Sequence, residues 1–194
     1  MLINMVLPGA AESAEKPFAF EYSGNFTDNR IDGVGTVRLN TSGTLTVTSG
    51  KATVSVYILG AGGGGLYKYY SGYYTRSSGG GGGYQTVTVE LSPGTYEIII
   101  GTGGLATTAN QWDGKQAGKG GDTTAFGYTS TGGTGGTSAT GNFSGTGGKG
   151  GTPNGNDGQS LVDDYTLGGA PNGGDSLYGT PSNGGDGYVE LTFI

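Results

Sequence analysis

The sequence predicts an all-β protein, a jelly-roll-like β-sandwich that carries long glycine-rich insertions, and three observations lead to this fold class. Several short segments alternate apolar and polar residues with a period of two and are rich in β-branched and aromatic side chains, the pattern of half-buried strands. Glycine supplies 46 of the 194 residues, in tight runs between those segments. Helical periodicity with suitable caps is not found along the chain.

The expected strands fall into a large group before residue 101 and one strand at the end of the chain. In chain order they are 18–22, 35–39, 44–48, 52–59, 85–91, 95–100 and 187–193. Short turns join neighbouring strands at Asn40–Gly43 and Ser92–Gly94. Because a strand follows the long region 101–185, that region is predicted to be an insertion whose two ends return to one sheet. We divide the chain into an N-terminal β attachment module, residues 1–50, and a glycine-rich β domain, residues 51–194.

The glycine runs, purest at Gly62–Gly65 and Gly79–Gly83, are expected to have an order of their own. A structureless loop as long as 101–185 is anomalous in a compact domain. Extended left-handed helices with three residues per turn have no internal hydrogen bonds. Where side chains are absent, their backbones can approach closely, and each N–H can pair with a carbonyl of another helix. We therefore predict packed polyglycine II-type helices; the alternative is a set of flexible glycine/serine loops.

Composition argues against several functional classes. The net charge is −6 and the nine basic residues are scattered, so we expect no nucleic-acid partner. Cysteine and histidine are absent, which removes disulfides, Cys/His zinc sites and the commonest general base. Residues Met1–Ala14 lack a positively charged start and are interrupted at Pro8-Gly9, so neither a signal peptide nor membrane insertion is expected. We predict a protein that is not an enzyme.

Three motif matches fail on their context, so no cofactor and no metal is predicted. Gly60–Gly65 satisfies the dinucleotide pattern G-x-G-x-x-G, but the residues after it do not open a helix. Lys149 is followed by Gly150 where a phosphate-binding loop needs serine or threonine. Asn154–Gly158 is loosely like a calcium loop, yet it lacks the bidentate acid at the twelfth position.

The segment between the two purest glycine runs, residues 66–78, carries the strongest functional signal. It holds five of the 13 tyrosines, mixed with serine and glycine, which is the composition of antibody paratopes. Two glycine stems would present it as an exposed aromatic tip, with Trp112 on a separate loop. The candidate receptor-binding residues are Tyr67, Tyr69, Tyr70, Tyr73, Tyr74, Arg76 and Trp112. The alternative is that these tyrosines cover the glycine lattice or pack against a neighbouring subunit.

The order of these features resembles the glycine-rich domain of bacteriophage tail-fibre and receptor-binding tip proteins, and more distantly that of certain animal receptor ectodomains. The resemblance rests on strand 54–60, glycine run, variable loop, glycine run, the strand pair around Ser92–Tyr96, the run Ile100–Gly104 and the ending Gly184–Leu191. It implies packed polyglycine helices whose loops contact a host receptor.

From this resemblance we expect a non-enzymatic virion protein, extracellular, that acts as a tail-fibre or tip adhesin. Its partners would be a host cell-surface glycan or protein and other virion subunits, with the chain forming a homo-oligomer. Two other functions stay open. One is a capsid or tail decoration or scaffold subunit whose loops make subunit contacts. The other is a secreted glycine-rich protein of a bacterial surface.

Overall fold

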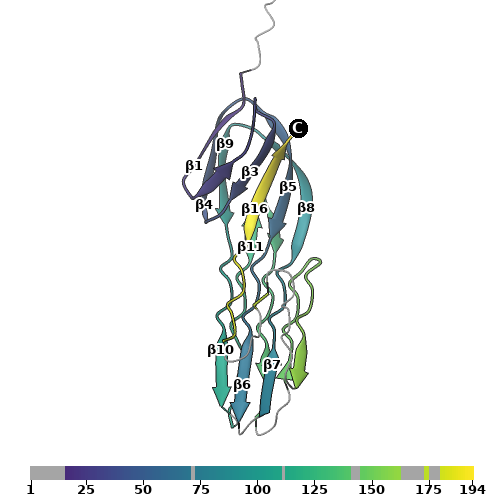
Figure 1. Ribbon diagram of the computed structural model, residues 1–194. Helices are drawn as coiled ribbons and strands as arrows, with labels where there is room; N and C mark the ends of the chain where they lie inside the picture. The colour runs from purple at the N-terminus through teal and green to yellow at the C-terminus, as the bar shows by residue number, and fades with distance from the viewer. Residues whose placement is uncertain (1–15, 71–72, 111, 141–144, 163–172, 175–179) are drawn as a thin grey trace, which may run out of the picture.

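The computed structural model describes residues 16–70, 73–110, 112–140, 145–162, 173–174 and 180–194. All regular secondary structure in these residues is β-strand, so the predicted all-β class is confirmed. The molecule is elongated (Figure 1), with a sandwich at one end and a small sheet at the other. Glycine-rich segments run side by side between the two ends.

Two five-stranded sheets make up the sandwich, and every neighbouring pair of strands in them is antiparallel. The first sheet has the order β1 (Ala19–Tyr22), β4 (Gly43–Ser49), β9 (Gly94–Ile99), β11 (Thr123–Ala125) and β12 (Tyr128–Ser130). The second has the order β2 (Phe26–Asp28), β3 (Gly35–Leu39), β16 (Tyr188–Phe193), β5 (Ala52–Leu59) and β8 (Tyr84–Leu91).

One apolar core lies between the two sheets. Along β5 and β16, every second residue points inward and is buried, which is the period-two alternation that the sequence displays. The first sheet contributes matching residues from β4 and β9, such as Leu45 and Ile98. Because both inner faces bury aliphatic side chains against each other, the hydrophobic effect holds the sheets together as a sandwich. The core members are Val37, Leu39, Leu45, Val47, Val54, Val56, Ile58, Leu91, Ile98, Ile100, Ala125, Val189, Leu191 and Phe193.

The last strand confirms that the chain returns to the sandwich after its long excursion. β16 lies between β3 and β5 and pairs antiparallel with both. Strands from either side of residue 50 therefore share the same sheets: β3 joins β16, and β4 joins β9. The sandwich is thus built from the predicted attachment module and the predicted glycine-rich domain together.

The far end of the molecule is a four-stranded sheet that we call the distal sheet. Its order is β10 (Thr107–Asn110), β6 (Leu66–Tyr70), β7 (Tyr73–Ser77) and β15 (Ser160–Val162). β10 runs parallel to β6, whereas the other pairs are antiparallel. Beside it lies a two-stranded sheet of β13 (Thr137–Ser138) and β14 (Gly145–Thr146). These short strands were not predicted from the sequence, because they lie among threonine, serine and tyrosine residues without a long apolar alternation.

Candidate functional site

The glycine-rich segments between the sandwich and the distal sheet, which we call the stem, bond to one another through their main chains. Segment Gly60–Gly65 donates one hydrogen bond from each successive amide. The acceptors, in order, are the carbonyl oxygens of Gly83, Gly121, Gly185, Gly80, Gly118 and Ser182, at 2.8–3.0 Å. Every third residue therefore donates to the same neighbouring segment. The acceptor numbers fall as the donor numbers rise, so each of these neighbours runs in the opposite direction.

Other segments of the stem repeat this period of three. Gly80 and Gly83 donate to Thr134 and Thr131, at 2.9 and 2.8 Å. The donor pairs Gly118/Gly121 and Thr131/Thr134 follow the same rule. Their acceptors are Leu105/Thr102 and Thr152/Lys149, respectively. In a β-sheet a segment bonds to at most two neighbours, whereas segment 60–65 donates to three. The stem is consequently joined in more than one lateral direction.

Glycine is needed in the stem because the backbones touch. A Cβ atom added to Gly82 would overlap the carbonyl oxygen of Gly60, and one added to Gly79 would overlap that of Gly63. The same holds for Gly103 against Gly184. The atoms in the way are main-chain atoms, which cannot rotate aside as a flexible side chain can. The glycine runs are therefore closely packed structure.

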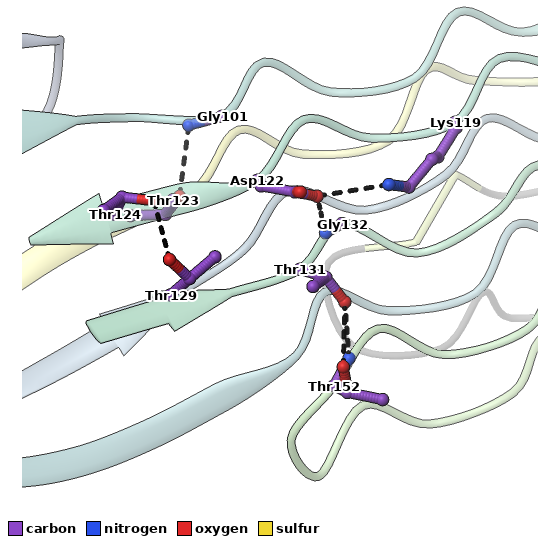
Figure 2. Close-up of polar contacts among 9 residues, drawn as sticks. All are labelled: Gly101, Lys119, Asp122, Thr123, Thr124, Thr129, Thr131, Gly132 and Thr152. Carbon is purple, nitrogen blue, oxygen red and sulfur yellow. Dashed lines mark hydrogen bonds and ion pairs between the residues drawn. The ribbon is translucent and has the colours of Figure 1, made fainter. Parts of the chain in front are cut away.

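Side-chain contacts fasten the stem to the sandwich where the two meet (Figure 2). The carboxylate of Asp122 accepts from the amide of Gly132 at 2.9 Å and from the Lys119 ammonium at 3.2 Å. The Gly132 amide, and after it Lys119, hold the pKa of Asp122 below its ordinary value, although burial acts in the opposite direction. Thr123 accepts from the amide of Gly101 at 3.1 Å. The backbones of Gly101 and Gly132, at this junction, are therefore held by the side chains of Thr123 and Asp122.

At the distal sheet, three predicted tyrosines form one stacked row. The register of β6 and β7 pairs Tyr69 with Tyr74 and places Tyr67, two residues away, on the same face. The ring centroids of Tyr69 and Tyr74 are 5.4 Å apart and those of Tyr67 and Tyr74 are 6.2 Å apart, both stacked. Tyr67 is 8% exposed and Tyr69 is 50% exposed. The row therefore begins inside the protein and ends in solvent.

The two basic residues of this hairpin are buried. Lys68 is fully buried, and its ammonium donates to the carbonyl oxygen of Ala139 at 2.5 Å. Burial lowers the pKa of Lys68, and the Asp113 carboxylate opposes that shift by favouring the charged form. Arg76, a predicted receptor contact, is 3% exposed. These two cations therefore belong to the interior of the distal end and present little charge to a ligand.

Trp112 lies at the same end as the exposed tyrosine. It follows strand β10 by two residues, and the last residue of β10, Asn110, pairs with Tyr69. Its side chain is 69% exposed. The ends of two adjacent strands thus each carry an exposed aromatic residue. The side chains of the remaining candidates, Tyr70 and Tyr73, lie outside the described residues, although their backbones pair across the hairpin.

An ion pair that sequence reasoning missed follows Trp112. Asp113 and Lys115 lie 3.5 Å apart and are both partly exposed. These two charged residues, which follow Trp112 in the sequence, are therefore close enough to compensate each other. No sequence motif marks this pair, because two charged residues at this spacing are common in loops.

Neither a metal-binding cluster nor a membrane-spanning helix is present in the part of the chain that the structure describes. Its aspartate and glutamate residues form no group of three or more that could hold a metal ion. Within the same residues there is no helix whose length and apolar character would let it cross a membrane.

The sequence belongs to a known family. The profile of the glycine-rich domain family matches residues 36–193, which covers most of the chain, and the protein is therefore a member of that family. The matched region starts within β3 and ends at the last residue of β16, so it includes sandwich strands as well as the stem and the distal sheet. A search of curated proteins found no match.

Proposed function

We propose that this glycine-rich protein is a non-enzymatic structural component of a bacteriophage virion, a tail-fibre or tip adhesin that binds a host-surface receptor. The observation that carries the proposal is the position of the exposed aromatic residues. Tyr69, on β6, and Trp112, two residues after the adjacent strand β10, lie at the distal end of an elongated molecule, whereas the C terminus lies at the sandwich end (Figure 1). A molecule attached through its sandwich would present these side chains away from the particle.

We also infer that the stem consists of polyglycine II-type helices. The support is the period of three in its hydrogen bonds, because a left-handed extended helix turns once every three residues and points successive amides in three directions. Such a stem buries its main chain and satisfies it at the same time. It would therefore hold the aromatic end in one position and reduce the entropy lost on binding a receptor.

The receptor contact is aromatic and neutral in this proposal. Tyrosine and tryptophan rings bury large areas, and their polar atoms remain free to hydrogen-bond at the edge of an interface. Lys68 and Arg76 are buried, and Asp113 and Lys115 pair with each other. We therefore expect a host glycan or a protein surface whose recognition does not depend on charge, and whose binding changes little between low and physiological salt.

The experiment is adsorption of the purified protein to host cells after removal of the two exposed rings. The double substitution Tyr69→Ala and Trp112→Ala should abolish binding and leave the circular dichroism spectrum unchanged. Tyr128→Ala is the matched control, since Tyr128 is 41% exposed but lies on β12 in the sandwich. Adsorption equal to that of the unchanged protein in the double variant would overturn the proposal.

The position of the distal sheets in an assembled particle distinguishes a decoration or scaffold subunit from an adhesin. If electron cryo-microscopy of a virion places the distal sheets between neighbouring subunits, the tyrosines make subunit contacts. If they face solvent at the end of a fibre, the adhesin is supported.

A further inference from the structure

The four edge strands of the sandwich differ in how well they are protected against pairing with another chain. An edge strand presents unpaired N–H and C=O groups, and natural proteins protect such edges by shortness, bulges, charges or coverage. β2 and β12 have three residues each. β1 has four, with a register shift between Ala19 and Phe20, and it carries Glu21. β8 has eight residues and pairs with β5 in unbroken register.

The hydrogen bonds of Tyr84, the first residue of β8, show which backbone groups of the strand point away from β5. The amide of Tyr84 donates outward, away from β5, to the carbonyl of Pro153 at 2.6 Å. The carbonyl of Tyr84 accepts from Asn154 Nδ2 at 3.0 Å. Residues of an antiparallel strand alternate in the side toward which they direct both groups. Thr86, Thr88 and Glu90 therefore direct theirs to the outer side.

This outer side is open in the described part of the molecule. The loop at Pro153 covers Tyr84, and the strand ends at Leu91. Between these limits, no described residue forms a hydrogen bond to the outward groups of Thr86, Thr88 or Glu90. β8 forms the outer margin of its sheet in Figure 1. The segment Thr86–Val89 contains no proline, no charge and no bulge, and the one charged residue of the strand, Glu90, lies next to its end.

We propose that β8 pairs antiparallel with β8 of a second copy of this chain, with Thr88 on the two-fold axis. The register follows from the open segment, because Thr88 is the middle one of its three outward residues. Thr88 then faces Thr88, and Thr86 faces Glu90 of the other copy. Each of the three residues donates one hydrogen bond and accepts one, so every open group is paired.

The side chains agree with this register. Threonine pairs directly opposite each other are favourable in antiparallel sheets, and like charges opposite each other are not. Glu90 faces a threonine in this register and keeps its own ion pair with Lys51, at 3.6 Å. Val87 and Val89 pack against the core of their own sandwich, and in this register each comes opposite the other residue of the second copy, Val87 facing Val89. The interface is self-complementary, as a two-fold dimer requires, and it is independent of the proposed receptor binding.

Cysteine cross-linking tests the register in the full chain, which has no natural cysteine. Paired residues in such a ladder have Cα atoms about 5.5 Å apart. A short bis-maleimide should therefore link Thr88→Cys protein into a covalent dimer. Thr86→Cys and Glu90→Cys are the matched controls. Each lies four strand positions from its own counterpart, roughly 13 Å along the strand, and should not be linked. Linkage of all three variants alike, or of none, would overturn the proposal.

Sedimentation velocity over a range of protein concentrations tests the dimer without a cross-linker. The unchanged protein should sediment as a dimer at high concentration. Thr88→Pro removes one outward N–H at an edge position where proline is tolerated, and it should abolish the dimer without unfolding the sandwich. Thr88→Val keeps the backbone groups and should retain the dimer. A monomer at every concentration, or a dimer that survives Thr88→Pro in a protein with an unchanged unfolding temperature, contradicts the proposal.

Discussion

The sandwich and the stem are both closely packed, but their interiors consist of different atoms. In the sandwich, aliphatic side chains such as Leu45, Ile58 and Leu191 are fully buried between two sheets. In the stem, carbonyl oxygens and Cα atoms of neighbouring glycines touch, so that an added Cβ at Gly63 would overlap Thr134. The sandwich is stabilised by removing apolar surface from water. The stem buries peptide groups, and this burial is tolerated because the peptide groups form hydrogen bonds with one another.

This difference shows that a run of glycines can be a structural element. In a flexible linker the conformational freedom of glycine is retained, whereas ordering it costs more entropy than ordering any other residue. The stem accepts that cost and in return brings several backbones within hydrogen-bonding distance. Four predictions test the contrast, beginning with the largest expected effect.

Removing a large side chain from the sandwich core should destabilise the whole protein. Leu191→Ala deletes buried methyl groups between β3 and β5 and leaves a cavity, which costs about 2–5 kcal/mol. Denaturant unfolding followed by circular dichroism measures the loss. Ile99→Ala, at a residue 45% exposed, is the control and should change the free energy of unfolding by only about 0.5 kcal/mol. Equal effects of the two variants would contradict the assignment of the core.

Adding a single methyl group to the stem should also lower the free energy of unfolding, but by less than the core substitution does. Gly82→Ala forces a Cβ against the carbonyl of Gly60, and overpacking of this type costs about 1–3 kcal/mol. The amides of the stem should exchange faster with solvent in this variant. Gly127→Ala is the control: Gly127 has a φ of 81° in the β11–β12 turn and open space around it. It strains one turn and should leave exchange in the stem unchanged.

In the unchanged protein, consecutive amides of the stem should be protected from hydrogen exchange. Every amide from Gly60 to Gly65 donates to another segment. An edge strand such as β8 directs alternate amides outward, so at dilutions where the chain is a monomer its protection should alternate. Exchange measured by NMR distinguishes the two patterns. Rapid exchange throughout 60–65 would show that the stem is not ordered in solution.

The smallest effect is a dependence on pH at the junction between the two regions. The pKa of Asp122 is lowered from 3.8 in the folded protein, so its carboxylate stabilises the fold above that value. The contribution is lost as the pH falls through the lowered pKa. Asp122→Asn should therefore be less stable than the unchanged protein at neutral pH, and the gap should close under acid. Because Asp122 is substantially exposed, the gap should also shrink at high salt.

The sandwich was predictable because its side chains repeat with the period of a strand. The expected segments 52–59 and 85–91 correspond to Ala52–Leu59 and Tyr84–Leu91. The alternation that identified them is the alternation that fills the core. The final strand was also recognisable, since Tyr188–Phe193 has the same pattern.

The stem and the distal end were harder to predict because their neighbours are distant in the sequence. Glycine residues carry no side chain that distinguishes one segment from another, so the partners of Gly60–Gly65 could not be assigned from composition. The burial of Lys68 depends on Ala139, 71 residues away. The tyrosines were identified as a group, but which of them reach solvent depends on their position along the hairpin: Tyr67 and Tyr69 share one face, and Tyr67 is buried whereas Tyr69 is exposed.

The repeat of three in the stem restricts how a molecule of this kind can change its length. An insertion of one or two residues in a single segment would turn all later amides away from their acceptors, whereas an insertion of three residues would return them to equivalent positions. Longer or shorter relatives should therefore differ by multiples of three residues, with compensating changes in adjoining segments. The β6–β7 hairpin at the far end does not follow this repeat of three. Its sequence is therefore free to diversify while the stem stays the same.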